Sequence, residues 1–438
     1  MTKSLDTIFA LSSGALPSGV AVYRLSGDRA FAIAEDLAGK LSPARQASLR
    51  TIRLGNGLVL DRGLVLIFPA PHSFTGDDCV ELHLHGSKAV AKALLEDLAS
   101  RDGCRLAEHG EFTRRALDNG RIDLLEVEGL ADLLAAETEM QRRLAIEHSS
   151  GHLSALYGNW AERLTRARAM IEAELDFADE DDVPGSVSTM IWTDMGALAD
   201  ELRRHLHGAA FGEIIRDGLH VVIAGEPNAG KSSLMNALAQ RDVAIVTDIA
   251  GTTRDVLHVD LDVGGYAVRL YDTAGLRETN EIVEQEGIRR ALKTIGDADL
   301  VLSLAEIGTP AARSFAQFGG DVLTIGTKLD LHGDSAAYDL CLSAVTSAGI
   351  AALRDRLQAY LTDRAEGLSL SLPSRERQKQ WLVAALEHLT LATERQDMDL
   401  DLRAEALRLA AQDLGRITGR VDVEDLLGII FSEFCIGK

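Results

Sequence analysis

The spacing of apolar and polar residues divides the chain into four zones, of which the first mixes strand-like and helical patterns. In residues 1–120, the apolar runs 20–25 (VAVYRL) and 64–68 (LVLIF) predict strands. The alternating run 80–85 (VELHLH) predicts a strand with one buried face, and residues 89–99 follow with a helical pattern. This zone is therefore expected to form a compact α+β domain.

The second zone, residues 121–217, is rich in Ala, Leu, Glu and Arg. Its apolar positions, for example from Leu130 to Ala145, recur at helical spacing and predict long amphipathic helices. The acidic stretch 176–182, which precedes Pro184, is expected to interrupt these helices.

The third zone, residues 218–365, alternates strand-like runs with helical ones. The strand-like runs are 220–224, 267–271, 300–304 and 322–325. Alternation of this kind predicts a mostly parallel sheet with crossover helices.

The last zone, residues 366–438, is helical again through 381–394 and 402–414, and a further helix is expected to begin near Asp422. The simplest arrangement inserts the third zone into one helical domain built from both of its flanks. The predicted fold class is a multidomain α/β protein with an inserted nucleotide-binding domain.

Composition narrows the class of protein. With 46% apolar and 26% charged residues the chain has the balance of a globular protein. The net charge of −22 argues against a broad nucleic-acid-binding surface, so a basic partner is expected if the substrate is a nucleic acid. The four cysteines lie far apart, which fits a reducing cytoplasm better than a zinc or disulfide framework. No apolar run approaches the roughly 18 residues of a membrane span, and no signal peptide is evident.

A glycine-rich segment, residues 225–232 (GEPNAGKS), matches the phosphate-binding pattern GxxxxGK[ST]. It follows an apolar strand and precedes a helical pattern, which is the context that the motif requires. Backbone N–H groups of such a loop cradle phosphates. Lys231 is expected to reach the β- and γ-phosphates, and the Ser232 hydroxyl to bind Mg²⁺.

Four further segments follow in the order expected of a GTPase. Asp272, at a strand end, begins DTAG and suits the Mg²⁺ water shell, and Thr253 offers a second Mg²⁺ hydroxyl. Asp330 of TKLD can accept hydrogen bonds from guanine N1 and N2, and 343–344 places a backbone N–H near guanine O6. Together they predict a GTP-binding domain. Its expected nucleotide contacts are Asn228, Ala229, Gly230, Lys231, Ser232, Ser233, Thr247, Asp248, Ile249, Ala250, Gly251, Thr252, Thr253, Asp272, Thr273, Ala274, Gly275, Thr327, Lys328, Asp330, Ser343, Ala344 and Val345.

Two positions depart from the common GTPase pattern. Thr327 stands where asparagine is usual, so a loop-tethering hydrogen bond is expected to be weaker. Leu276 follows DxxG where many GTPases carry a water-orienting glutamine. Spacing alone leaves three replacements open, Glu281, Glu284 and Glu286, against the alternative of a solvated helix face.

No arginine finger is evident, and Asn228 offers a different source of positive charge. Its side-chain oxygen can bind a monovalent cation that neutralises transition-state charge. The alternative is an asparagine selected for its turn propensity.

The chain resembles the MnmE (TrmE) family of tRNA modification GTPases over essentially its whole length. The resemblance lies in PNAGKSSLMNAL, TDIAGTTRDV, DTAGLRE and the terminal FCIGK, and in the N-terminal stretches GVAVYRLSG, FTGDDCVELHLHG, HGEFTRRAL and NGRIDLLEVEGLADLL. It implies four segments: a folate-binding and dimerisation domain (1–120), a helical domain in two parts (121–217 and 366–438) and an inserted GTPase domain (218–365).

The resemblance also implies partners and cofactors. It implies a cytoplasmic homodimer that binds no membrane, with K⁺ and Mg²⁺ at GTP and a 5-formyl- or methylene-tetrahydrofolate as one-carbon donor. The flavoprotein MnmG (GidA), which carries FAD, joins it in a heterotetramer, and tRNA is contacted mainly through that complex. The reaction installs an aminomethyl-type (carboxymethylaminomethyl) group on C5 of the wobble uridine. The alternatives are a regulatory or ribosome-assembly GTPase without one-carbon chemistry, and a folate enzyme that GTP only regulates.

Residue roles carried over from the family are catalytic and ligand-binding. Glu284 is implied to orient the hydrolytic water. K⁺ is implied to bind Asn228, Thr247, Ile249 and Thr252, Mg²⁺ to bind Ser232 and Thr253, and folate to contact Arg24, Glu81 and Arg121. Position 121 is lysine in many members, so Arg121 keeps the charge and changes the geometry.

The roles of two further groups of residues are left open, one in the N-terminal zone and one in the C-terminal tail. Glu81, His83 and His85 fall on one strand face, so half of a metal site is weighed against a site without metal. Cys435, in the tail that ends at Lys438, is either a reactive thiol near the folate or an ordinary buried residue.

Overall fold

The computed structural model describes residues 6–176, 186–239, 258–272, 298–309, 321–395 and 397–419, together with Phe434 and Gly437. By internal contacts the chain divides into two compact units. The first unit comprises Met1–Ala131, Ser154–Gly158 and Gly415–Lys438, and the second comprises Asp132–Leu153 and Asn159–Leu414. Each unit is described separately below.

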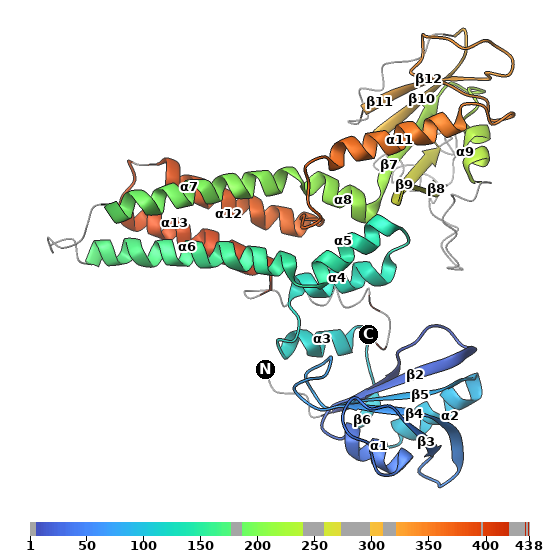
Figure 1. Ribbon diagram of the computed structural model, residues 1–438, viewed down its shortest axis with the longest axis vertical. Coiled ribbons are helices and arrows are strands. Elements are labelled where there is room, and N and C mark those ends of the chain that lie inside the picture. Colours follow the sequence, from blue (N-terminus) through green and yellow to red (C-terminus); the bar gives the residue numbers. More distant parts are fainter. Residues whose placement is uncertain are drawn as a thin grey trace, which may run out of the picture. The chain divides into compact units, whose positions relative to one another are not determined.

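The first unit contains a six-stranded sheet with the strand order β3-β4-β5-β2-β1-β6 (Figure 1). Its strands are β1 (Thr7–Leu11), β2 (Ser18–Ser26), β3 (Ser48–Arg53), β4 (Val59–Phe68), β5 (Cys79–Gly86) and β6 (Cys104–Leu106). All neighbours pair antiparallel except β1 and β6, which are parallel. The strands predicted at 20–25, 64–68 and 80–85 are confirmed within β2, β4 and β5.

Helices α1 (Ala30–Ala38) and α2 (Lys88–Ala99) share one apolar core with this sheet. In β5 the side chains of Val80, Leu82 and Leu84 are buried in that core, whereas Glu81 and His83 are half-buried. The predicted alternation in this strand is therefore confirmed, because successive side chains of a strand point to opposite faces. A third helix, α3 (Glu111–Asp118), buries Phe112 against Ile8 and Ala10 of β1.

The second unit contains another six-stranded sheet, with the order β12-β11-β10-β7-β9-β8. Its strands are β7 (Leu219–Gly225), β8 (His258–Val263), β9 (Tyr266–Asp272), β10 (Leu300–Glu306), β11 (Asp321–Thr327) and β12 (Leu340–Cys341). All pairs are parallel except the β8–β9 pair at one edge. The predicted mostly parallel sheet is confirmed.

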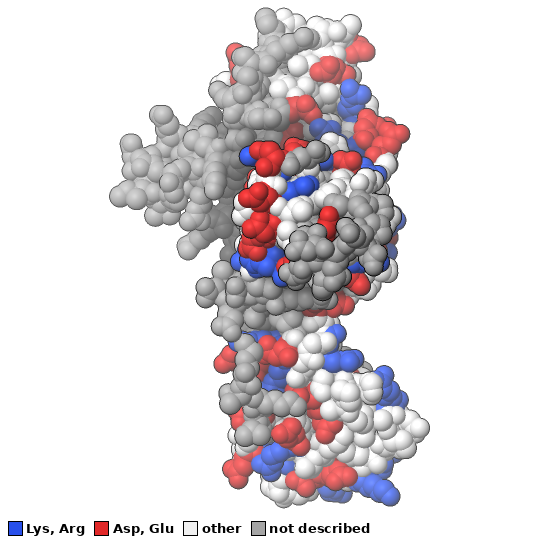
Figure 2. Space-filling view, turned by 90° about the vertical axis from the view of Figure 1, so that its left-hand side faces the viewer, with Lys and Arg blue, Asp and Glu red and all other residues white. Residues whose placement is uncertain are grey.

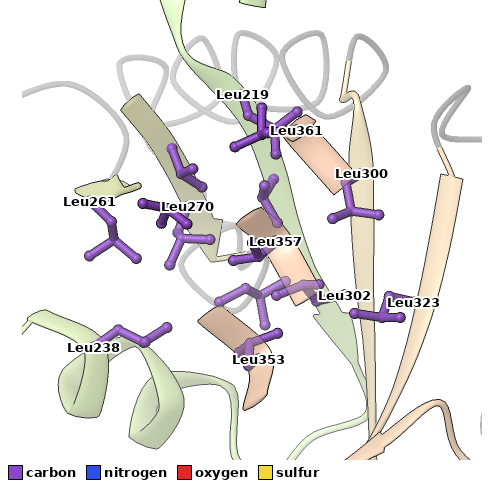
Figure 3. Packing of buried hydrophobic residues seen from close by; sticks show 14 of the residues in the cluster. Leu219, Leu238, Leu261, Leu270, Leu300, Leu302, Leu323, Leu353, Leu357 and Leu361 are labelled. Carbon is purple, nitrogen blue, oxygen red and sulfur yellow. The ribbon is translucent and has the colours of Figure 1, made fainter. Parts of the chain in front are cut away.

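Leucines fill the core between this sheet and helices α9 (Lys231–Ala239) and α11 (Ile350–Ala365) (Figure 3). In β10 six consecutive residues, 300–305, are buried. Such a continuous buried run is expected where helices or loops cover both faces of a parallel strand.

The remaining helices are α4 (Leu124–Ala135), α5 (Glu139–Ser149), α6 (His152–Asp176), α7 (Ser186–His207), α8 (Ala209–Asp217), α12 (Glu376–Glu394) and α13 (Leu400–Ile417). Within the second unit α7 and α12 lie side by side (Figure 1). The Arg403 guanidinium of α13 lies 3.5 Å from the ring centroid of Trp192 in α7, and its Nε donates to the Ala392 carbonyl of α12. This arginine therefore links three helices. None of the described helices is both long and apolar enough to cross a membrane.

The helices predicted from the spacing between Leu130 and Ala145 are confirmed as two elements, because α4 ends at Ala135 and α5 begins at Glu139. A capping box starts α5: Thr138 is extended and accepts from the Gln141 N–H, while Gln141 Oε1 accepts from the Thr138 N–H. The Gln141 side chain also donates to the Arg216 carbonyl, which ties this helix start to the end of α8.

The interruption predicted at residues 176–182 lies outside the described residues except for Asp176. The helix expected near Asp422 lies outside the described residues. The bounds of the four predicted segments stay predictions. On the face drawn in Figure 2, acidic and basic side chains are interspersed over the described surface.

Candidate functional sites

The phosphate-binding loop lies between β7 and α9 and depends on glycine and asparagine backbones. A Cβ atom at Gly225 would lie 2.3 Å from the Leu304 carbonyl oxygen, so no larger residue fits there. Gly230 has φ +93° and Asn228 has φ +69°. Both lie in the left-handed region, which glycine adopts freely and asparagine tolerates better than most residues. The turn alone therefore accounts for asparagine at position 228, and the cation role stays a prediction.

Two side chains at the start of α9, Lys231 and Ser232, are held by hydrogen bonds. The Lys231 ammonium is buried and donates to the carbonyls of Gly225 and Glu226, at 2.8 and 2.9 Å. Ser232 Oγ donates to Asp272 Oδ2 at 3.2 Å. The contact arises because β7 pairs with β9, which sets Ile223 opposite Asp272. The structure thus brings together a hydroxyl and a carboxylate that suit a Mg²⁺ shell.

The guanine end of the site is formed by the loops after β11 and β12. Asp330 Oδ1 accepts from Ser343 Oγ at 2.5 Å, and the same hydroxyl oxygen accepts from the Thr346 N–H at 3.2 Å. Ser343 is fully buried. The Asp330 carboxylate is therefore held in one orientation before any base binds.

Thr327 joins the guanine end to the phosphate end. Its Oγ1 donates to the Ala229 carbonyl at 2.8 Å and lies 3.2 Å from the Ala305 carbonyl. A tether to the phosphate-binding loop is thus present although the usual asparagine is not. Its strength relative to an asparagine tether stays a prediction.

Thr327→Val is expected to weaken GTP and GDP binding by about 5–150-fold. The substitution keeps the shape but leaves a buried carbonyl without its donor, at about 1–3 kcal/mol. Titration of a fluorescent GDP analogue would measure the change. Thr327→Ser, which retains the hydroxyl, is the matched control and should bind nearly as the unchanged protein does. Equal affinity of the valine variant would show that the tether does not hold the loop.

A cavity of about 550 Å³ connects these two ends. This volume falls in the usual range for small-molecule sites. Among the described residues it is lined by Pro227, Asn228, Gly230, Lys231, Ser232, Ser233, Thr327, Lys328, Asp330, Leu331, Leu342, Ala344 and Val345. The structure therefore places most of the described predicted contacts around one cavity.

Glu306, which pairs with the cavity-lining Lys328, is a residue that the sequence reasoning missed. It ends β10, forms an ion pair with the Lys328 ammonium and lies 3.0 Å from His332 Nε2. The hydrogen bonds from Lys328 and His332 hold the pKa of Glu306 below its usual value. A charged residue at the end of a buried strand was the available signal.

Several predicted site residues lie outside the described residues. They are Thr247, Asp248, Ile249, Ala250, Gly251, Thr252, Thr253, Thr273, Ala274, Gly275, Glu281, Glu284, Glu286, Cys435 and Lys438. Their roles stay predictions.

A second candidate site lies on the sheet of the first unit, where Arg24 of β2 pairs across the strands with Glu81 of β5. Arg24 donates to Glu81 Oε1 from Nη2 at 2.9 Å and from Nε at 3.2 Å, and Glu81 Oε2 lies 3.2 Å from His83 Nε2. The guanidinium also lies 5.3 and 5.7 Å from the ring centroids of Phe74 and Phe112. Burial opposes ionisation of Glu81, but Arg24 and His83 together outweigh it and lower the pKa of Glu81.

Arg121 reaches the same region through a loop. Its Cγ would lie 3.2 Å from a Cβ placed on Gly76, two residues after Phe74. Asn119 Nδ2 donates to the Thr75 carbonyl at 2.8 Å, which fixes that loop to the segment carrying Arg121. All three predicted folate contacts therefore belong to one part of the first unit.

The histidines of β5 have separate carboxylate partners. His83 contacts Glu81, whereas His85 Nδ1 lies 2.8 Å from Asp61 Oδ1. In the part of the chain that the structure describes, no group of three His, Cys, Asp or Glu side chains is arranged to hold a metal ion. The geometry gives no support to a metal site at His83 and His85.

The glycine-rich loop, the strand-end Asp272 and the TKxD loop on a mostly parallel sheet define the P-loop GTPase fold class. The comparisons with known proteins narrow this class to one family. The family model "GTP-binding protein TrmE N-terminus" matches residues 7–121, and the model "MnmE helical domain" matches residues 124–435.

Full-length relatives agree with these models. The tRNA modification GTPase MnmE of Rhizobium etli (strain CIAT 652) is 59% identical and covers 99% of this chain and 99% of its own length. That of Rhizobium meliloti (strain 1021) is 59% identical over 99% and 100%, and that of Brucella canis is 53% identical over 99% and 98%. The chain therefore belongs to the MnmE (TrmE) family.

Solved structures match only part of the chain. The G domain of the T. maritima FeoB iron transporter is 26% identical and covers 34% of this chain and 99% of its own, with a TM-score of 0.23. A score this low leaves the family assignment to rest on the sequence relatives.

Proposed function

We propose that the protein hydrolyses GTP and acts in tRNA modification. The observation that carries the proposal is the single cavity that joins the phosphate-binding loop to the Asp330 and Ser343 loops. Relatives at 53–59% identity are named tRNA modification GTPases, and they align with nearly the whole chain. A regulatory GTPase without tRNA chemistry remains an outcome of the tests below.

In this proposal the loop N–H groups and Lys231 bind the phosphates, and Asp330 binds the guanine base. Ser232 and Asp272, 3.2 Å apart, fit a Mg²⁺ ion, and Thr253 is the proposed second hydroxyl ligand. The metal would supply positive charge at the β- and γ-phosphates. The Lys231 ammonium would exchange its two loop carbonyls for phosphate oxygens, so it needs no large rearrangement.

We further propose that K⁺ binds at Asn228, with Thr247, Ile249 and Thr252 completing the site. GTP turnover is then expected to be at least about 10-fold faster in KCl than in NaCl at equal ionic strength, because a correctly sized cation stabilises developing charge. Phosphate-release assays would measure this ratio. Asn228→Ala should abolish this ratio. Asn228→Gly keeps the left-handed turn and removes only the side chain, so it should abolish the ratio as well. Equal rates of the unchanged protein in both salts would reject the K⁺ site.

The proposed one-carbon donor is a 5-formyl- or methylene-tetrahydrofolate at Arg24, Glu81 and Arg121. A carboxylate such as Glu81 accepts from pterin N–H groups, and arginines suit the carboxylates of the glutamyl tail. Phe74, which lies beside the Arg24 guanidinium and is 37% exposed, offers aromatic surface for a flat ring.

The proposed assembly is a homodimer that works with the flavoprotein MnmG, which carries the FAD. Leu49 of β3 pairs with Leu64 of β4, and Leu64 pairs with His83 of β5, so these residues lie in one row on the sheet face opposite the helices. The two leucines are 55% and 39% exposed. Exposed apolar side chains on a sheet face favour contact with a second copy of the chain. MnmG would supply most of the basic surface for tRNA.

Glu81→Ala is expected to abolish 5-formyl-tetrahydrofolate binding and wobble-uridine modification while GTP hydrolysis persists. The two sites use different sheets, so loss of one leaves the other intact. Calorimetry with the folate and mass analysis of the wobble nucleoside, with MnmG and GTP present, would measure both. Glu96→Ala is the matched control, because Glu96 is an exposed carboxylate on α2 of the same unit. Full modification by the Glu81 variant would favour a GTPase without one-carbon chemistry.

A further inference from the structure

The two described residues of the C-terminal tail lie against the first unit. Phe434 is 3% exposed and packs with the buried side chains of Leu124 and Val127. Gly437 has φ +102°, and a Cβ placed there would lie 2.3 Å from the Leu11 carbonyl oxygen. The backbone at Gly437 therefore lies directly against the end of β1, where only glycine fits.

A histidine side chain forms a hydrogen bond with the backbone of Phe434. His109 Nδ1 lies 2.9 Å from the carbonyl oxygen of Phe434, which is 325 positions away in the sequence. A carbonyl oxygen can only accept, so His109 donates from Nδ1. His109 precedes Gly110, the left-handed residue at which α3 begins.

The turn that carries His109 also supports the Arg24–Glu81 pair. Phe112, three residues later, is fully buried, and its ring lies below the Arg24 guanidinium at 5.7 Å. The contact of Gly437 with Leu11 is close to β2, the strand that carries Arg24. The Ser12 N–H donates to the Val22 carbonyl, and Ala10 of β1 pairs with Arg24. Segment 109–112 thus touches the tail at one end and Arg24 at the other.

We propose that His109 is a positioning residue that couples the seating of the C-terminal tail to ligand binding at Arg24 and Glu81. The identity of the ligand, a reduced folate, rests on the proposed function. The anchor, by which we mean the hydrogen bond between His109 and Phe434, does not rest on it. Coupling of this kind is reciprocal: if the seated tail favours the ligand, the ligand favours the seated tail by the same factor.

Hydrogen exchange of the full-length protein tests the anchor. His109→Ala should speed amide exchange in the peptide containing Phe434 and Gly437 by about 10-fold, since the carbonyl loses its donor. His109→Asn, which offers a side-chain N–H, should restore much of the protection. His72→Ala removes an exposed histidine of the same unit and should change nothing. Faster exchange throughout α1, α2 and α3 would mean that His109 supports the whole unit, and would overturn the proposal, as would unchanged exchange of the tail peptide.

Ligand titration tests the coupling. For the unchanged protein, 5-formyl-tetrahydrofolate should slow exchange of the tail peptide, and His109→Ala should weaken folate binding by about 5-fold, at the lower end of usual coupling factors. GTP affinity should stay the same. Identical folate affinity of the two proteins would overturn the coupling. If the unchanged protein binds no folate while its tail still depends on His109, the folate assignment fails and the coupling with it, but the anchor stands.

Discussion

Asp330→Asn is expected to lower GTP affinity by about 10²–10⁴-fold. The carboxylate would accept from guanine N1–H and N2–H together, and each hydrogen bond to a charged acceptor contributes about 1.5–3 kcal/mol. The structure strengthens this expectation, because the Ser343 hydroxyl already orients the carboxylate. An amide in its place has only one oxygen, so its NH2 group faces one of the two guanine N–H groups. Neither of these two facing donors then has an acceptor.

The same variant should gain affinity for xanthosine triphosphate. The added carbonyl of xanthine accepts from the new amide, so specificity changes rather than disappears. Competition titrations with both nucleotides would measure the switch. Asp334→Asn, four residues further along the same loop, is the control and should keep the preference for guanine. Undiminished GTP binding by the Asp330 variant would mean that TKLD does not contact the base.

Glu284→Ala is expected to lower the GTP hydrolysis rate by about 10²–10⁴-fold, the usual contribution of a residue that prepares the attacking water. The chain needs such a residue because Leu276 stands where glutamine is common, and leucine cannot polarise water. GTP affinity should hardly change, since the proposed role is confined to the hydrolytic step. Single-turnover hydrolysis combined with equilibrium binding separates the two effects.

Glu281→Ala and Glu286→Ala are matched controls for Glu284, because they remove equal charge from the same segment. Both should hydrolyse GTP at nearly the rate of the unchanged protein. A Glu284 variant with near-normal turnover would return that residue to a solvated helix face. A large loss in one of the controls would assign the water to that residue instead.

Regular spacing of apolar residues predicted the strands and helices reliably. Alternation in residues 80–85 predicted β5, and the apolar runs of residues 218–365 predicted the parallel sheet. Helical spacing between Leu130 and Ala145 predicted helices there but did not locate the break between α4 and α5. Thr138 and Gln141 begin α5 with a capping box, and the Gln141 side chain also donates to a carbonyl at the end of α8. Periodicity does not report such a contact.

The sequence by itself determined the nucleotide chemistry of this protein. Phosphate and guanine recognition use short contiguous loops, in which residue type and spacing set the backbone turn and the donors together. Only the tertiary structure decided which distant side chains meet: Thr327 with Ala229, Lys328 with Glu306, Phe112 with Arg24, and His109 with Phe434. The physical reason is that these contacts depend on strand order and register. Burial of many side chains sets that register, and no local pattern encodes it.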